Sequence, residues 1–185
     1  MIAKRDGREI PKHIAVIMDG NGRWATKQGA MRIFGHRRGV QAVRDITEGC
    51  AELGVDHLTL YAFSTENWSR PQKEVDGLMN LLIKTINVEL PVLMKNKVRL
   101  TAIGDLQGRA TGVHKKLSVA IDETKVNKGL NLILALNYSG KWDLTQAFKV
   151  ICGEVIKGTI KSEAIDEGLV SDYLSTKGIP DPELL

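Results

Sequence analysis

Short apolar runs alternate along the chain with longer segments whose apolar residues recur at helical spacing. The first run, residues 14–18, is continuously apolar, as is typical of a strand covered on both faces. The short runs predict strands over residues 14–18, 57–63, 98–103 and 131–138. The periodic segments predict helices over residues 39–53, 73–96, 111–127, 142–157 and 162–177.

This alternation predicts an α/β fold with a central parallel sheet flanked by helices. The 185 residues can bury one sizeable core, and no repeat or linker divides them, so we expect residues 1–185 to form a single domain. Ligands of open parallel sheets bind beyond the carboxyl ends of the strands. The polar loops that follow residues 18 and 63 should therefore share one rim.

The predicted helix over residues 73–96 carries apolar residues on more than one stripe. A surface helix needs only one apolar face. Two interpretations stay open: the helix is enclosed in a thick core, or one of its faces lines a channel for a long apolar ligand.

Composition excludes several classes of protein. Apolar residues make up 43% and charged residues 26%, as in soluble globular proteins. The net charge of +4 gives no reason to expect a nucleic-acid partner, but it suits an anionic substrate. Cys50 and Cys152 lack metal-site spacing and are expected to be buried, reduced thiols. With neither a signal segment nor a run of roughly 18 apolar residues, a cytoplasmic location is expected.

The first strand runs directly into Asp19-Gly20-Asn21-Gly22-Arg23-Trp24. A carboxylate can hold a divalent cation, glycines let backbone N–H groups approach an anion, and arginine pairs with phosphate. These residues are candidates for a metal and diphosphate site. The alternative is an ordinary turn, because Asp, Gly and Asn favour turns.

A basic cluster follows, made of Arg32, His36, Arg37 and Arg38. It precedes a predicted helix, where positive charge is unfavourable unless an anion is bound. Arg32 and His36 are four residues apart and would share a helical face. We expect the cluster to contact diphosphate. A solvated charged surface is the alternative.

The second polar loop, residues 64–71, follows the second strand. Its candidate ligand-binding residues are Ser64, Thr65, Glu66, Asn67, Trp68 and Arg70. Hydroxyl, amide and guanidinium groups bind phosphate oxygens, and an exposed Trp could cover an apolar ligand. In the alternative interpretation, Ser and Asn cap the following helix.

These segments together resemble the cis-prenyltransferases, most closely the bacterial undecaprenyl diphosphate synthases. The resemblance spans nearly the whole chain and consists of several long motifs in the right order. Its motifs are residues 13–15, 18–24, 35–36, 39, 60–68, 70–71, 104–105, 137–138 and 180–181.

The resemblance implies repeated addition of isopentenyl diphosphate to an allylic diphosphate such as farnesyl diphosphate, with each new double bond cis. It implies that Asp19 holds Mg²⁺ and that Asn67 positions or relays the proton that is removed. Gly20, Asn21, Gly22, Arg23, Arg32 and His36 would bind the allylic diphosphate, with Trp24 beside it. Residues 64–70 would position isopentenyl diphosphate.

The resemblance also implies an apolar tunnel between sheet and helices, with Leu130 as a candidate floor residue. It further implies a homodimer. Because the product partitions into membranes, transient contact with a membrane surface is expected as well.

Two departures from the family pattern concern the C-terminal part. In the family, an Arg-rich segment for isopentenyl diphosphate and a Glu that completes the metal site would follow Leu185. We therefore expect the chain to lack a C-terminal segment and, as it stands, to bind the allylic diphosphate poorly with metal. Lys141 stands where an arginine is expected.

Two other functions remain alternatives. A phosphatase could use Asp19 as its nucleophile, although Asn21 stands where such enzymes usually have a second acid. A non-catalytic subunit of a prenyl synthase is the other, against which the intact Asp19, Arg32 and Asn67 argue. A P-loop motif and the aspartate-rich DDxxD motif of all-helical prenyltransferases are both absent from the sequence.

Overall fold

The computed structural model describes residues 4–5, 8–106 and 111–185. Within this part of the chain, a four-stranded sheet has the order β3-β4-β6-β5, and every neighbouring pair is parallel. The α/β fold with a parallel sheet is thus confirmed. The strands are β3 (His13–Ile17), β4 (His57–Ser64), β5 (Arg99–Ile103) and β6 (Asn131–Tyr138).

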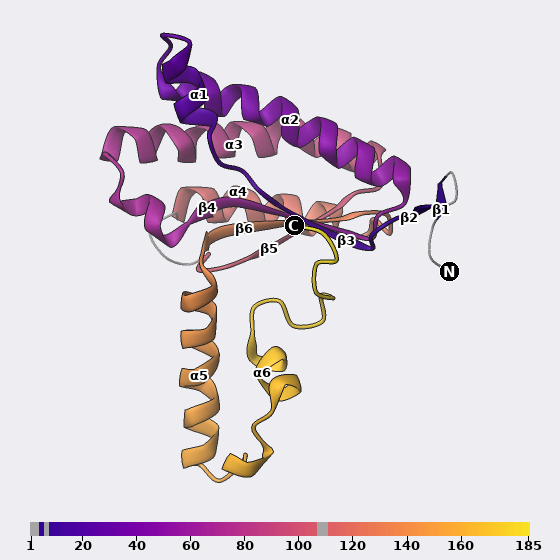
Figure 1. Cartoon of the computed structure of the whole chain (residues 1–185), viewed down its shortest axis with the longest axis vertical. Coiled ribbons are helices and arrows are strands. Elements are labelled where there is room, and N and C mark those ends of the chain that lie inside the picture. Colours follow the sequence, from indigo (N-terminus) through magenta and orange to yellow (C-terminus); the bar gives the residue numbers. More distant parts are fainter. Residues whose placement is uncertain (1–3, 6–7, 107–110) are drawn as a thin grey trace.

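Helices connect the strands and continue after the last one. Figure 1 shows α2, α3 and α4 over one face of the sheet, whereas α5 projects away from the other side. A small antiparallel pair, β1 (Lys4–Arg5) and β2 (Arg8–Glu9), precedes the sheet. The helices are α1 (Asn21–Lys27), α2 (Arg32–Leu53), α3 (Gln72–Lys95), α4 (Thr111–Thr124), α5 (Gly140–Ile156) and α6 (Glu167–Tyr173), with 3₁₀ turns η1 (Thr65–Ser69) and η2 (Ser162–Ala164).

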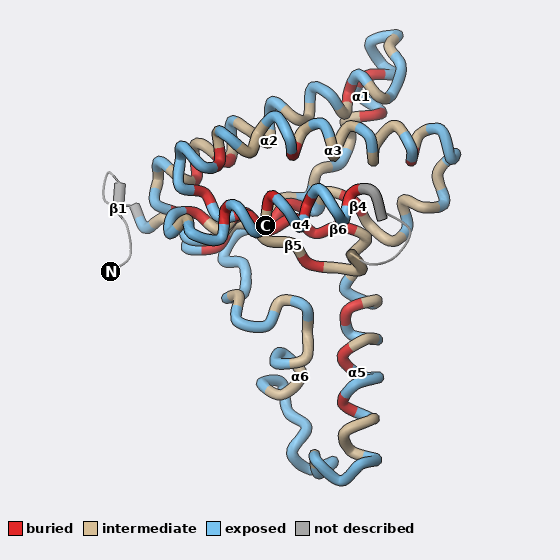
Figure 2. Tube along the Cα trace, turned by 180° about the vertical axis from the view of Figure 1, so that it is seen from behind, coloured by how far each residue is buried: buried red, intermediate tan, exposed pale blue. Residues whose placement is uncertain are grey.

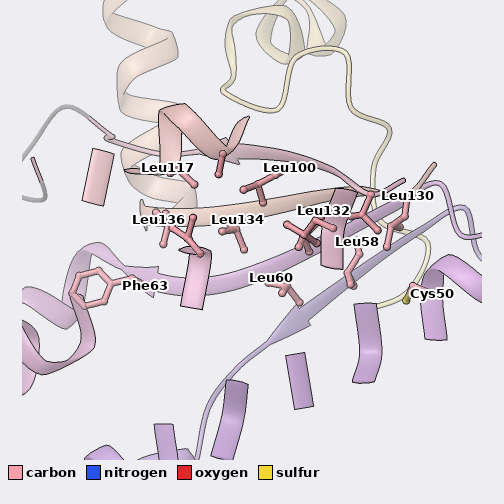
Figure 3. Close-up of a cluster of buried hydrophobic side chains, with 14 of the residues drawn as sticks. Cys50, Leu58, Leu60, Phe63, Leu100, Leu117, Leu130, Leu132, Leu134 and Leu136 are labelled. Atoms are coloured by element: carbon pink, nitrogen blue, oxygen red, sulfur yellow. The ribbon is translucent and has the colours of Figure 1, made fainter. Parts of the chain in front are cut away.

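The main core lies between the sheet and the helices above it. Figure 2 shows buried positions concentrated along the strands and on the sheet-facing sides of these helices. Figure 3 shows leucines of β4, β5 and β6 meeting Leu117 of α4 and Cys50 of α2. Strands whose side chains are buried this fully read as apolar runs, which is why the sequence located them well.

Three expectations are corrected. The second helix begins at Arg32 instead of residue 39, because Gly35 and Gly39 are packing residues inside it. The helix expected over residues 162–177 is divided into η2 and α6, since the Asp166 side chain accepts a hydrogen bond from Leu169 N and caps a new helix. Cys152 is exposed, because α5 projects from the sheet.

The end of the chain lies against β3. Ala15 N donates to Leu184 O at 2.8 Å, and Glu183 N donates to His13 O at 2.9 Å. The buried His13 imidazole bonds both Thr59 Oγ1 and the carbonyl of Pro180. Residues 180–184 are thereby held beside the strand that leads to Asp19.

By length and composition, α3 alone among the helices of the described residues is apolar enough to cross a membrane. In this fold it packs along α4 and α2, and the residues that face the sheet side include the buried Val75, Ile86 and Leu93.

Contact between α1 and α2 is close enough to exclude a side chain at Gly35. A Cβ atom there would lie 1.9 Å from the backbone oxygen of Asn21. Gly39 is similarly close to the Asn21 side chain, at 2.8 Å. The first turns of α2 therefore fix the position of the loop that follows β3.

We expect Gly35→Ala to destabilise the protein by about 1–3 kcal/mol, since α1 must move to relieve the overlap. Gly49→Ala is the matched control, because it lies in the same helix and an added Cβ meets nothing within 4 Å. That control should be neutral or stabilising by about 0.5–1 kcal/mol. Urea unfolding of both variants measures the difference. Equal stabilities would contradict the proposed close contact.

Candidate functional site

An apolar cavity of about 190 Å³ lies between α2, α3 and the sheet. Its wall on the α3 side includes Leu78, Leu82, Ile86 and Leu93. This arrangement favours the second interpretation of the long apolar helix, in which one face lines a channel. It also confirms the expected apolar space between sheet and helices.

The cavity has a polar end and an apolar end. Asn21, Asn67 and Arg70 follow the carboxyl ends of β3 and β4 and line the cavity together with His36. Val98 and Leu100 line it at the amino end of β5. Because the strands are parallel, the polar group lies toward the carboxyl ends of the strands and the apolar group toward their amino ends. Leu130, the expected floor residue, is buried in the adjoining core but does not itself line the cavity.

His36 presents an unused polar atom at the polar end. Its Nε2 is buried and has no hydrogen-bond partner among the described residues. Burial lowers the pKa of His36, and the positive charges of Arg70 and Arg32 lower it further, against an opposing effect of Glu74. The imidazole is therefore neutral at pH 7. A buried polar atom of this kind is costly unless a ligand atom satisfies it.

Glu74 holds two arginines beside His36. Its Oε1 accepts from Arg32 Nε at 3.2 Å and from Arg70 Nη1 at 3.0 Å. One carboxylate between two guanidinium groups leaves a net positive charge. In addition, α2 begins with Arg32 and has no acidic residue in its first turn, which makes the local field more favourable to an anion.

The loop after β3 is more than a turn, because α1 begins at Asn21. Gly20 has a left-handed backbone with φ of 89°, which a side chain would disfavour. Gly22 lies against α2, where an added Cβ would be 2.9 Å from the Arg32 guanidinium. Asn21 reaches the cavity, whereas Trp24 is exposed and is not among its lining residues.

Asp19 is an exposed carboxylate that pairs with Arg23. Arg23 Nη2 donates to Asp19 Oδ2 at 2.7 Å, and both side chains are about 70% exposed. Within the described ranges, no group of three or more His, Cys, Asp or Glu side chains is arranged to hold a metal ion. One carboxylate still fits Mg²⁺, which commonly keeps waters and takes its other ligands from substrate phosphates.

The loop after β4 combines capping with access to the cavity. Asn67 Oδ1 accepts from Ser64 N at 3.1 Å, and the Ser64 side chain accepts from the backbone N–H of Asn67. Together these two hydrogen bonds form a capping box at the start of η1. Asn67 and Arg70 also line the cavity. Ser64, Thr65, Glu66 and Trp68 do not appear among its lining residues. The capping interpretation therefore holds for Ser64 and Asn67, whereas ligand binding by Asn67 and Arg70 stays a prediction that their place at the cavity allows.

Trp68 has a structural position, with its ring at 5.1 Å from Phe63 and its Nε1 donating to Asn137 Oδ1 at 2.7 Å. Asn137 Nδ2 in turn donates to Asp105 O at 3.1 Å. These bonds connect η1 to the carboxyl ends of β5 and β6. Asn137 itself adopts a left-handed backbone with φ of 50°.

Sequence reasoning missed the roles of Glu74 and Asn137. Glu74 belongs to the first turn of α3, where an acidic residue is ordinary, and its spacing from Arg70 is also the i,i+4 spacing of an ion pair. No local signal pointed from Asn137 to Trp68, which lies 69 residues away. The basic cluster is also divided. His36 faces the cavity and Arg32 joins Glu74, but Arg37 and Arg38 are exposed.

The charges around His36 predict opposite effects of two substitutions on its pKa. Arg70→Gln should raise this pKa toward the ordinary histidine value, and Glu74→Gln should lower it further. Proton NMR titration of the imidazole measures both, with the exposed His114 as an internal control. Shifts of the same sign in both variants would contradict the arrangement described.

The lowered pKa of His36 determines how the stability of the folded protein changes with pH. His36 binds its proton less readily when the protein is folded, so its contribution to stability is present above the ordinary histidine pKa. This contribution is lost as the pH falls through the folded pKa.

Comparison with known proteins gives concordant matches. The model of the family described as putative undecaprenyl diphosphate synthase matches residues 17–185. The isoprenyl transferase of Chlorobaculum tepidum is 48% identical over 176 residues, which are 95% of this chain and 66% of that protein. The Aliivibrio fischeri protein named ditrans,polycis-undecaprenyl-diphosphate synthase ((2E,6E)-farnesyl-diphosphate specific) is 44% identical over 95% of this chain and 68% of its own length.

Solved structures share the fold. Lavandulyl diphosphate synthase from Lavandula x intermedia, in complex with dimethylallyl diphosphate, superposes with a TM-score of 0.90 at 31% identity, covering 94% of this chain and 76% of that one. A probable undecaprenyl diphosphate synthase from Campylobacter jejuni has a TM-score of 0.69 at 33% identity, covering 89% and 69%. The chain spans about two thirds of the length of the curated relatives that it matches.

Proposed function

Because the chain belongs to the undecaprenyl diphosphate synthase family, we propose that it is the part of a cis-prenyltransferase that binds the allylic diphosphate and encloses the growing chain. The observation that carries the proposal is the polar end of the cavity. There the unpartnered His36 Nε2 and the Arg32–Glu74–Arg70 cluster adjoin an apolar space of about 190 Å³. Diphosphate suits the first part, and an isoprenoid tail suits the second.

The reaction proposed is condensation of isopentenyl diphosphate with an allylic diphosphate such as farnesyl diphosphate. The allylic C–O bond breaks and diphosphate leaves with its electron pair. A C–C bond forms at the allylic carbon, and isopentenyl diphosphate loses a proton to give a cis double bond. Repetition would give a long polyprenyl diphosphate, with undecaprenyl diphosphate as the proposed product of a cytoplasmic enzyme.

Each residue has a proposed role that fits its place. Arg32, Arg70 and His36 would donate to the allylic diphosphate and stabilise charge as it develops on the leaving group. Asn21, which lines the cavity, would donate beside them, with Gly20 and Gly22 allowing close approach and Trp24 packing outside. Arg23 would move from Asp19 to the substrate.

Asp19 would hold Mg²⁺, and the bound ion would supply positive charge to the diphosphate leaving group. Asn67 is a poor base as an amide, so we assign it to orienting isopentenyl diphosphate and its departing proton. Ser64, Thr65, Glu66 and Trp68 would support that substrate from the same loop, Trp68 through its bond to Asn137.

The comparisons support transfer chemistry over the two alternatives. The matching relatives named above are transferases and synthases, and neither name describes a phosphatase that would use Asp19 as nucleophile. The polar residues at the cavity are also intact, which argues against a non-catalytic subunit.

Asp19→Ala should lower kcat by about 10²–10³-fold or more, because it removes the carboxylate proposed to hold the cation. The assay measures incorporation of labelled isopentenyl diphosphate into polyprenyl product, with Mg²⁺ and a range of allylic primers. Asp45→Ala is a matched control, since Asp45 is an exposed carboxylate of α2 that bonds only Gln41 among the described contacts.

The chain is assayed alone and joined to the part of the Chlorobaculum protein that follows its aligned region. Product from neither form, with any primer, would refute the proposed activity. Residual turnover of Asp19→Ala near that of the parent would refute only the role of Asp19.

We also propose that the side of the sheet opposite α3 binds a second copy of the chain. Parallel sheets are normally covered on both faces. Here α5 projects away and exposes Leu144 and Phe148 four residues apart, while Tyr61 of β4 is 38% exposed. A symmetric partner would cover these apolar side chains.

Leu144→Ser combined with Phe148→Ser should therefore weaken self-association at least about tenfold, as expected when central apolar contacts of an interface are lost. Sedimentation velocity across a concentration series measures the dimer dissociation constant. Val88→Ser removes an even more exposed apolar side chain, from α3, and should leave the dissociation constant unchanged. A monomeric parent at all concentrations would exclude the dimer.

A further inference from the structure

The corner between α1 and α2 carries exposed apolar and basic side chains that the proposed active site does not use. Met31 is 67% and Phe34 44% exposed. Lys27, Arg37 and Arg38 are exposed beside them. We refer to these five residues as the corner patch. It lies at the end of the molecule away from α5, as Figure 1 shows.

The members of the corner patch lie together. Phe34 N donates to Met31 O at 2.9 Å, which places these two residues on the first turn of α2. The Arg37 guanidinium lies 5.5 Å from the centre of the Phe34 ring. Arg38 follows Phe34 by four residues and so shares its helical face. Trp24, 48% exposed, precedes Lys27 by one turn of α1.

The patch has a strong positive bias. Residues 20–44 include six basic residues and no acidic one. Arg32 and Arg44 are engaged with Glu74 and Glu89, and Arg23 with Asp19. None of the ion pairs found in the described part of the chain involves Lys27, Arg37 or Arg38. Further along α2, the exposed Asp45 carries the same negative charge as an anionic surface and would be repelled by it, which limits the contact to the start of the helix.

This combination fits one kind of partner. Apolar side chains can enter the boundary between headgroups and acyl chains while long basic side chains reach the phosphates. Basic side chains alone would fit any polyanion. Binding a purely polar polyanion, however, would leave the apolar side chains of Met31 and Phe34 exposed to water. The patch lies at the corner between α1 and α2, at one end of the molecule (Figure 1), so it can meet an extended flat surface without a groove.

We propose that the corner patch docks the protein on the surface of an anionic lipid bilayer. Met31 and Phe34 enter the interface, and Lys27, Arg37 and Arg38 bind lipid phosphates. The patch is carried by the same two helices that supply Asn21, Arg32 and His36 to the polar end of the cavity. Docking there brings that end of the cavity close to the membrane surface, and it leaves α5 free for a second copy.

The test is flotation of the 185-residue chain with vesicles. Vesicles of phosphatidylglycerol mixed with phosphatidylcholine should carry the chain at least about tenfold better than phosphatidylcholine alone, given the added attraction of each basic side chain. Raising the ionic strength from about 0.1 M to about 1 M shortens the Debye length from about 10 Å to about 3 Å and should release most of it.

Two double variants separate the contributions. Met31→Ser with Phe34→Ser, and Arg37→Gln with Arg38→Gln, should each reduce flotation at least about tenfold. Val119→Ser with Val126→Ser and Lys115→Gln with Lys116→Gln change equally exposed side chains on and after α4, and they should float like the parent. Circular dichroism melting checks that all four variants fold.

Each remaining outcome overturns the proposal. Equal flotation with neutral vesicles would exclude recognition of anionic lipid. Loss only in the arginine variant would mean adsorption by charge alone, without insertion of Met31 and Phe34. Equal losses in the control variants would remove the corner patch as the docking surface. The assay needs no substrate, so its result is independent of the proposed transferase activity.

Discussion

The backbone of Asn21 lies directly against Gly35, with room between them for a hydrogen atom and nothing larger. This contact sets how near α1 comes to α2, and the site depends on that distance. It holds Asn21 at the cavity and lets the Arg32 side chain lie over Gly22. It also leaves the turn between the helices exposed. A glycine is required at this position for steric reasons, since Gly35 is in a helix and needs no unusual backbone conformation.

The sheet could be predicted from sequence because its strands are buried and therefore apolar. Leu58, Leu60 and Ile133 are among the fully buried residues, and such runs leave little doubt about a strand. The start of α2 could not be predicted in the same way. Gly35 and Gly39 look like breaks by helix propensity, and only the neighbouring α1 turns them into packing residues. The start of α2 is therefore set by its packing against α1 and not by local helix propensity.

The candidate site was predictable as a set of loops and only partly as a set of contacts. Strand ends identified Asn21, Asn67 and Arg70, because a parallel sheet brings its carboxyl ends to one rim. The partner of both arginines, Glu74, comes from the first turn of α3, where an acidic residue also has an ordinary explanation as a helix-start residue. The bond between Trp68 and Asn137 joins distant parts of the chain and has no local pattern. Arg37 and Arg38 differ from Arg32 and His36 only in which side of α2 they occupy.

The middle of the cavity poses a problem for an apolar ligand, because Arg44 and Glu89 both line it. Arg44 donates through Nε and Nη2 to the two carboxylate oxygens of Glu89, a fork that joins α2 to α3. Hydrogen bonding to Glu89 raises the pKa of Arg44, which favours its charged form further. Such a pair offers little net charge to a neighbouring hydrocarbon chain. The pair also links the two helices across the cavity wall. An apolar tail can therefore pass beside this ion pair. Either charge alone, without its partner, would exclude the tail.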